Sequence, residues 1–154
     1  MTSRRSSTLV PYSAQQMYEL VADIERYPEF LPWCLGLRVV KTTRDGEGVP
    51  TKIADMIVAY KMFREKFRSE ARLDQEKTRI DVHYVDGPFH HLRNRWQFND
   101  QEGGGSRVDF EIEFEFRNFV LQTTAQSVFE KAFLRMSEAF VARADDVYGA
   151  VKVG

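Results

Sequence analysis

The sequence predicts an α+β domain in which a curved antiparallel sheet of about seven strands packs against one long C-terminal helix. Residues 35–116 alternate between apolar and polar side chains, with short turns between the runs. This pattern is typical of antiparallel strands that bury one face of their sheet. Residues 120–149 instead repeat apolar side chains every three or four positions, which is typical of a helix with one apolar face. Such a helix is expected to cover the apolar face of the sheet.

The C-terminal helix carries its apolar side chains on a single stripe. The stripe consists of Val128, Phe129, Ala132, Phe133, Met136, Phe140, Ala144, Val147 and Tyr148. Most charged residues of the segment lie off this stripe, and Gly149 is a suitable stop for the helix. A helix of roughly 28 residues would be about 42 Å long, so it needs a large apolar surface to cover.

An isolated strand and two short helices are expected before the meander. Residues 7–12 are predicted to be extended. Ser13 precedes Gln16 by three positions, which is the pattern of a capping box at the start of a helix. Asp23 is a candidate cap for a second short helical turn.

The segment 27–34, Tyr-Pro-Glu-Phe-Leu-Pro-Trp-Cys, contains two prolines four positions apart, which exclude a regular helix. One interpretation is a linker that Phe30 and Trp33 attach to the core, and the other is the rim of a ligand cavity. Cys34 is the only cysteine, so an internal disulfide is excluded and a reducing compartment is favoured. We expect its thiol to be a small buried apolar group and not a nucleophile.

Six strands are expected in the meander, separated by turns such as Asp45-Gly46 and Asp86-Gly87-Pro88. The clearest runs from Val108 to Phe116, where large apolar residues alternate with acidic ones. The segment 52–61 has apolar residues at both odd and even positions, so the sequence does not indicate which of its side chains face the core.

Composition limits the classes of function. The chain has 154 residues, 43% of them apolar, and a formal net charge of −1. These values fit one globular domain over residues 1–154, without a global charge that would attract DNA. The N-terminal residues lack the apolar run of a secretory signal, and no apolar stretch is long enough to cross a bilayer. A cytoplasmic location is therefore expected.

Catalytic and metal-binding patterns were not found. His83, His90 and His91 have no further ligand at the spacing of a metal site. The glycine-rich segment 103–106 precedes neither a lysine nor a helix, so a hairpin loop is expected there and not a phosphate site. We therefore expect neither an enzyme nor a bound cofactor.

Two polar residues, Glu65 and Asn94, share the parity of apolar neighbours in their strands. A bulge or strand end would turn them to water, and this is the favoured interpretation for Glu65. The alternative is that they face an apolar cavity, where they would bind a polar ligand head, because an unbonded polar group there is costly.

The strand positions that alternate with the apolar ones carry charged side chains. Arg64, Lys66 and Arg68 form a basic stripe on one strand, and pairing across the glycine loop would place Arg95 near Asp109 or Glu111. Cross-strand ion pairs on a solvated face are one interpretation. The other is a partly unpaired stripe that contacts anionic lipid or RNA phosphate.

The order of a strand, two short helices, a meander and a long final helix resembles the helix-grip fold of START-like lipid-binding domains. Residues 27–34 resemble the segment after the first helices of the coenzyme Q-binding START-domain proteins. Asp86-Gly87-Pro88-Phe89, followed by Leu92 and Trp96, resembles the strand-turn signature of that family.

Residues 108–118, Phe129 and residues 136–149 are similar to the final strand and helix of the same family. The resemblance therefore covers nearly the whole chain. The wider group is named after polyketide cyclases and dehydrases, and it includes bacterial proteins described as ribosome-association toxins.

This resemblance implies an apolar cavity between helix and sheet that binds ubiquinone or another isoprenoid lipid. The expected role is that of a carrier for respiratory membranes, with transient contact to the inner membrane. The alternatives are a ribosome-binding toxin that blocks subunit association and an aromatic polyketide cyclase or dehydratase. The residues expected to bind the ligand are Trp33 at the rim and Leu37, Phe67, Tyr84, Asn94, Trp96, Phe110, Phe114, Phe133, Met136 and Phe140.

A long apolar tail needs a path into such a cavity. We therefore expect either the helix 120–149 or the segment 27–34 to move when ligand enters.

Overall fold

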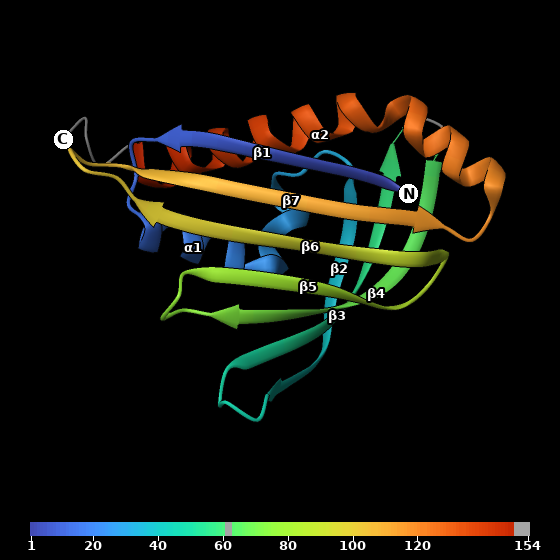
Figure 1. The fold of residues 1–154 in the computed structure, drawn as a ribbon, viewed down its shortest axis with the longest axis horizontal. Helices are drawn as coiled ribbons and strands as arrows, with labels where there is room; N and C mark the ends of the chain where they lie inside the picture. Colours follow the sequence, from blue (N-terminus) through green and yellow to red (C-terminus); the bar gives the residue numbers. More distant parts are fainter. Residues whose placement is uncertain (61–62, 150–154) are drawn as a thin grey trace.

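The fold is one seven-stranded antiparallel sheet that curves around the long helix α2 (Figure 1). It is a computed structural model that describes residues 1–60 and 63–149. In chain order the elements are β1 Thr2–Val10, α1 Ala14–Ala22, the 3₁₀ helix η1 Ile24–Glu29, β2 Cys34–Arg44, β3 Pro50–Tyr60, β4 Phe63–Asp74, β5 Arg79–Asp86, β6 Phe89–Asp100, β7 Ser106–Phe116 and α2 Phe119–Tyr148. The strand order is β1-β7-β6-β5-β4-β3-β2, which confirms the predicted fold class.

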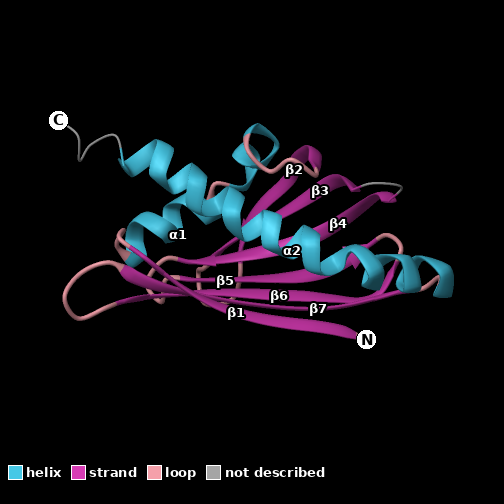
Figure 2. Ribbon diagram, turned by 90° about the horizontal axis from the view of Figure 1, so that it is seen from above, coloured by secondary structure: helices cyan, strands magenta, loops and turns pink. Residues whose placement is uncertain are grey.

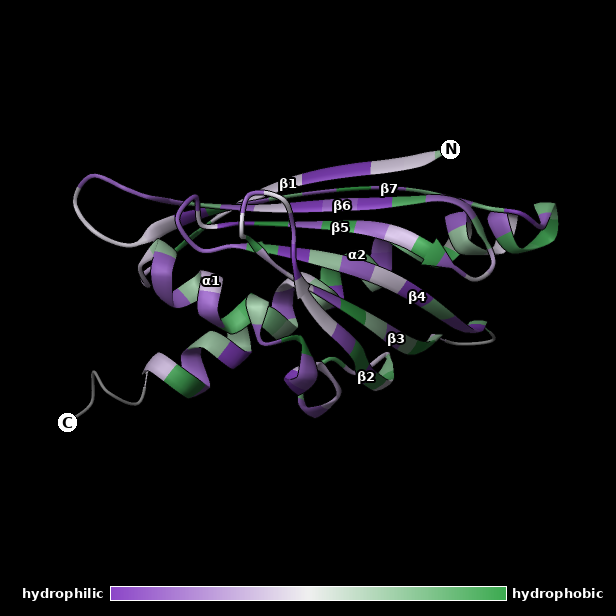
Figure 3. Ribbon diagram, turned by 90° about the horizontal axis from the view of Figure 1, so that it is seen from below, coloured by the Kyte–Doolittle hydropathy of each residue, from purple (hydrophilic) through white to green (hydrophobic). Residues whose placement is uncertain are grey.

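Figure 2 shows α2 lying across one face of the sheet, with α1 beside its C-terminal half. The hydroxyl of Tyr148 donates to the backbone oxygen of Gln16 at 2.8 Å, which ties the two helices together. Along most of the strands hydrophobic and hydrophilic residues alternate (Figure 3), so these strands present an apolar side to the helices and a polar side to solvent.

Helix ends follow the predicted signals in part. Ser13 and Gln16 form the expected capping box, with the Gln16 backbone nitrogen 3.1 Å from Ser13 Oγ. Asn118 caps α2, since its Oδ1 accepts hydrogen bonds from the backbone nitrogens of Val120 and Leu121. Asp23 stands at the N-cap position of η1, but its side chain makes no capping hydrogen bond, so that part of the prediction is wrong.

The N-terminal strand is longer than predicted and is not isolated. It begins at Thr2 and pairs antiparallel with β7 from Thr2↔Phe114 to Val10↔Ser106. Its first residues are polar, so the sequence shows no apolar alternation there. Backbone pairing and ion pairs hold this edge strand instead, including Arg4 with Glu130 of α2 at 3.1 Å.

The start of α2 is held by the buried side chain of Gln122. Its Oε1 accepts a hydrogen bond of 2.8 Å from the backbone nitrogen of Phe116. Its Nε2 donates to the hydroxyl of Thr2 at 3.0 Å. One side chain therefore connects α2 to β7 and β1 directly after the chain turns from sheet to helix.

The turn between β5 and β6 fits closely against β4. Gly87 has a φ of +141°, and a Cβ there would lie 2.7 Å from Cβ of Phe67. Only glycine fits at this separation without a shift of β4. The Asp86-Gly87-Pro88-Phe89 motif therefore sets the position of Phe67, which faces the interior.

On the outer face, Arg95 does lie opposite Glu111 in the β6–β7 register, as predicted. Its side chain turns the other way, however, and its Nε donates to Asp81 of β5 at 2.6 Å. The predicted position of Arg95 near Glu111 is therefore confirmed, and its cross-strand ion pair is formed with Asp81.

Candidate ligand-binding cavity

Two adjoining chambers lie between α2 and the inner face of the sheet. The outer chamber has a volume of about 200 Å³ and is partly open to solvent. Its walls are Trp33, Val58, Tyr60, Phe63, Phe67, Phe89, Leu92, Phe110, Ile112, Phe114, Phe116, Ala125, Val128, Phe129, Ala132, Phe133 and Met136. All of these side chains are apolar except for the phenol of Tyr60 and the indole nitrogen of Trp33, so the chamber suits a hydrocarbon chain.

The inner chamber has a volume of about 160 Å³ and extends under η1. Its walls are Ile24, Tyr27, Leu31, Trp33, Leu37, Lys52, Ala54, Met56, Phe67, Ser69, Ala71, Ile80, Val82, Leu92, Asn94, Trp96, Phe110, Ile112, Met136 and Phe140. It has more polar groups than the outer chamber, from Tyr27, Trp33, Lys52, Ser69 and Asn94.

The chambers adjoin and share part of their walls. The shared residues are Trp33, Phe67, Leu92, Phe110, Ile112 and Met136. Each chamber alone is smaller than the roughly 300–1,000 Å³ of a typical ligand cleft. A long ligand would therefore occupy both.

The structure brings the residues predicted to bind ligand together on these walls, with one difference. Trp33, Phe67, Phe110 and Met136 line both chambers, Leu37, Asn94, Trp96 and Phe140 line the inner one, and Phe114 and Phe133 line the outer one. Tyr84 lines neither, because its hydroxyl accepts a hydrogen bond of 3.2 Å from the backbone nitrogen of Phe89 and its ring packs on Phe89 behind the wall.

Several wall residues were not among those predicted to bind ligand, for example Leu92 and Ile112. Their parity placed them on the inner face, but every apolar residue of that face carries the same signal. Glu65 is half-buried and lines neither chamber.

The segment 27–34 is both attached to the core and part of the cavity. The rings of Tyr27 and Phe30 meet that of Phe140 edge-on, at centroid distances of 5.4 and 5.2 Å. Arg143 of α2 lies over the Phe30 ring at 5.1 Å and pairs with Glu29 at 3.2 Å. These contacts hold the C-terminal half of α2 to η1.

Cys34 is buried at the start of β2. Burial raises the pKa of its thiol to about 11. The thiol therefore stays protonated at neutral pH and is a poor nucleophile, as expected from the sequence.

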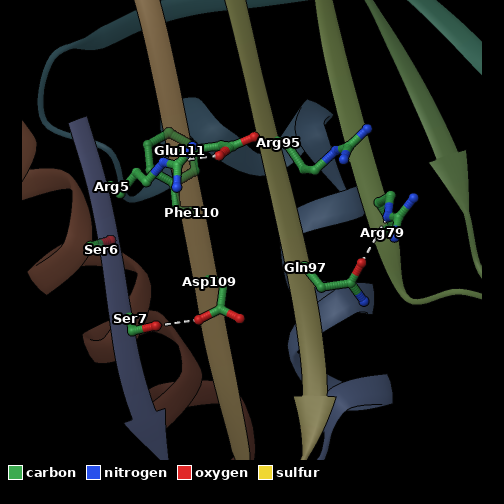
Figure 4. A pocket seen from close by; sticks show the side chains of 9 residues that line it. All are labelled: Arg5, Ser6, Ser7, Arg79, Arg95, Gln97, Asp109, Phe110 and Glu111. Carbon is green, nitrogen blue, oxygen red and sulfur yellow. Dashed lines mark hydrogen bonds and ion pairs between the residues drawn. The ribbon is translucent and has the colours of Figure 1, made fainter. Parts of the chain in front are cut away.

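A separate hollow of about 510 Å³ lies on the outer face of the sheet, across β1, β7, β6 and β5 (Figure 4). Its polar side chains are largely paired with one another. Ser7 donates to Asp109, Arg79 donates to Gln97 at 2.7 Å, and Arg5 pairs with Glu111 at 3.4 Å. Because these groups already form hydrogen bonds and ion pairs with one another and are open to solvent, the two chambers under α2 are the stronger candidate for a ligand site.

The predicted basic stripe is only partly free. Arg64 and Lys66 are exposed. Arg68 instead forms a two-point ion pair with Asp55 of β3, at 2.7 and 3.1 Å, and this pair lowers the pKa of the Asp55 carboxyl. Arg68 is therefore neutralised and differs from the other two cations.

Within residues 1–60 and 63–149, no group of three or more His, Cys, Asp or Glu side chains is placed to bind a metal ion. In the same part of the chain, no helix is long and apolar enough to cross a membrane.

A seven-stranded sheet that grips a long helix around an apolar cavity defines the START-like, helix-grip class of ligand-binding domains. The chain belongs to the family described as "Polyketide cyclase / dehydrase and lipid transport", whose model matches residues 10–141.

Relatives within this family differ in their described roles. The "Ribosome association toxin RatA" of Escherichia coli strain K12 is 36% identical over 94% of this chain and 87% of its own length. The "Coenzyme Q-binding protein COQ10 homolog B, mitochondrial" of Xenopus laevis is 30% identical over 96% of this chain and 59% of its own length. The crystal structure of the Zhui aromatase/cyclase from Streptomyces sp. R1128 superposes with a TM-score of 0.81 over 97% of both chains. At 15% identity that likeness shows the fold alone.

Proposed function

We propose that this protein binds a polyprenyl quinone, such as ubiquinone, or a similar isoprenoid lipid, and carries it to respiratory membranes without transforming it. The observation that carries the proposal is the outer chamber, whose walls are almost entirely hydrocarbon and lead into a second chamber with polar groups. The similarity to a protein described as coenzyme Q-binding supports the same class of ligand.

Hydrocarbon contacts alone supply affinity for such a ligand. Burial of each CH₂ group contributes about 0.8 kcal/mol, so four carbons of a tail contribute about 3 kcal/mol. Aromatic rings line the outer chamber from several directions, including Phe67, Phe114 and Phe129. They present a large apolar area at low entropic cost because they are already packed against one another.

The chemistry of the walls supports a carrier and not a cyclase. Among the described residues, no carboxyl or imidazole side chain lines either chamber. A cyclase or dehydratase needs a group that transfers protons near neutral pH. The titratable groups on the walls are those of Lys52, Tyr27 and Tyr60, and burial raises the pKa of Tyr27 far above neutral.

Titration with decylubiquinone tests the proposal. Trp33 lines both chambers and Trp96 the inner one, so a bound quinone ring is expected to quench indole fluorescence in a saturable way. The variant Trp33→Phe is expected to lose the part of the quenching that comes from Trp33 and to keep the part from Trp96, while equilibrium dialysis still detects binding. Quenching that rises linearly without saturation, together with no retention in dialysis, would contradict the proposal.

Contact with an anionic membrane is part of this proposal. Phe119 and Val120 at the start of α2 are 83% and 68% exposed. The adjacent β4 strand supplies exposed Arg64 and Lys66, and its Phe63 packs against Phe116 at 5.1 Å. Apolar and basic side chains therefore lie together at this end of the molecule, as surfaces that bind anionic lipid require.

Ribosome association is a second candidate, favoured by the 36% identity to the RatA protein. Arg64→Glu with Lys66→Glu is expected to weaken binding to phosphatidylglycerol vesicles in sedimentation about 30-fold at low salt, since each of the two basic residues contributes about 1 kcal/mol. Under the ribosome candidate, the same variant loses cosedimentation with ribosomal subunits instead.

The matched control is Arg38→Glu with Lys41→Glu on β2, which changes the net charge equally at another exposed site. If both double variants bind vesicles and subunits like the unmodified protein, Arg64 and Lys66 are ordinary surface residues. An equal loss in the two variants would indicate net charge and not a specific contact.

Ligand entry requires movement, and we propose that the N-terminal half of α2 supplies it. The C-terminal half is held by Arg143–Glu29 and by the rings around Phe140. The N-terminal half covers the outer chamber through Ala125, Phe129 and Phe133. Its displacement would break the hydrogen bonds of Gln122 and the ion pair of Arg4 with Glu130, which are the contacts described above for this half. Displacement there would open the chamber toward the exposed Phe119 and Val120.

A further inference from the structure

Two buried polar atoms on the wall of the inner chamber have no partner. They are the side-chain oxygen Oδ1 of Asn94 and the indole nitrogen Nε1 of Trp33. Neither forms a hydrogen bond with any residue in the described part of the chain, and both are shielded from solvent. Buried polar groups without partners are rare in folded proteins because each loses its bonds to water.

The register of the sheet explains why Asn94 has no protein partner. It lies on β6 between Leu92 and Trp96, and all three side chains face inward. Its neighbours across the sheet are Val82 of β5 and Ile112 of β7, whose side chains have nothing to donate or accept.

Ser69 adds a third polar group to the same chamber. It lies on β4, is buried, and lines the chamber. The wall therefore offers one indole N–H donor, one amide with donor and acceptor atoms, and one hydroxyl, amid rings and aliphatic chains.

We propose that the inner chamber is the binding subsite for a hydroxylated aromatic ring, with Asn94 and Trp33 bonding its oxygen atoms and the apolar tail extending into the outer chamber. This inference rests on the proposed lipid-binding function, and it adds the orientation of the ligand and the chemical class of its head. The ring would lie against the aromatic faces of Trp96 and Phe110, which pack together at 4.3 Å.

The possible ligand head groups can be ranked by how many of these unpaired atoms they bond. A quinone carries acceptors only, so it satisfies the N–H of Trp33 but leaves Oδ1 of Asn94 without a donor. A hydroquinone or phenol carries O–H groups that both donate and accept, so it satisfies both atoms. A ring without oxygen satisfies neither. The expected order of affinity is hydroquinone, then quinone, then unsubstituted ring.

Three probes with the same ten-carbon tail test this order: decylhydroquinone, decylbenzoquinone and decylbenzene, measured anaerobically by equilibrium dialysis. The unmodified protein is expected to bind decylhydroquinone at least about tenfold more tightly than decylbenzene. In Asn94→Leu this ratio is expected to fall toward one, with the affinity for decylbenzene kept or increased. Trp33→Phe is expected to reduce the ratio in part.

Asn99→Leu is the matched control, because it places the same substitution on the same strand outside both chambers. It should leave the ratio unchanged. The melting temperature of Asn94→Leu is expected to stay equal or rise, since the substitution removes a buried unpaired oxygen.

Two outcomes would overturn the inference: a ratio near one in the unmodified protein, or an undiminished ratio in both Asn94→Leu and Trp33→Phe. Failure of the proposed function looks different, since none of the three probes would then bind saturably. Tight but equal binding of all three would leave the carrier function intact and exclude the polar subsite.

Discussion

Replacing Ala132 by phenylalanine is expected to weaken the binding of a decyl-tailed quinone about 100-fold while the protein stays folded. Ala132 lines the outer chamber from α2, and the added ring would occupy part of its volume of about 200 Å³. Displacing three or four methylene groups of the tail costs about 2.5–3 kcal/mol, which corresponds to the stated factor. Dialysis gives the affinity, and thermal unfolding shows whether the fold persists.

Ala142→Phe is the matched control, because Ala142 lies on the same helix but is exposed. It should bind the quinone normally. If Ala132→Phe also binds normally while melting at an unchanged or higher temperature, the tail does not occupy the outer chamber.

The second large effect is expected at the glycine loop between β6 and β7. Gly105 has a φ of +72°, and a Cβ there would overlap the backbone carbonyl oxygen of Val10. Gly105→Ala should therefore lower the free energy of unfolding by about 3 kcal/mol or more, from backbone strain and from displacement of the end of β1. Urea denaturation followed by circular dichroism measures this loss.

Gly103→Ala separates the two contributions. Gly103 has a φ of +91° but no atom near the position of a Cβ. Only backbone strain should appear, at about 1–2 kcal/mol. Equal losses in the two variants would mean that the contact between Gly105 and β1 is unimportant for stability.

Much of the fold was predictable because the spacing of apolar residues differs between the strands and the long helix. Side chains of β7 alternate without interruption, and those of α2 repeat at helical spacing, so the boundaries of α2 were predicted to within one residue at each end. The first half of β1 was missed because an edge strand held by backbone pairing and ion pairs needs no apolar alternation. The residues of β1 do not indicate a strand or ion-pair partner that lies more than 100 positions away in the sequence.

From the sequence, the cavity walls could be predicted only as the inward face of the sheet, and not residue by residue. Parity placed Phe67, Trp96 and Phe110 inward, and a polar residue at an apolar parity identified Asn94. Which inward residues reach the cavity depends on curvature, and this comes from bulges such as those at Arg68/Ser69 and Phe89/His91. Tyr84 was misplaced for this reason, since the adjacent turn puts Phe89 in front of it.

The pairing of β1 with β7 has a consequence for how the chain folds during its synthesis. The ribosome makes β1 first, but its partner, Ser106–Phe116, emerges only after the rest of the sheet. At translation rates of about 5–20 residues per second, β1 waits about 5–20 s for that partner. Closing so long a loop is entropically costly, so this pairing is expected late in folding. Until it forms, the backbone N–H and C=O groups along one edge of β7 have no strand partner, and nearby apolar side chains are not yet covered. At this stage the nascent chain is most prone to aggregation.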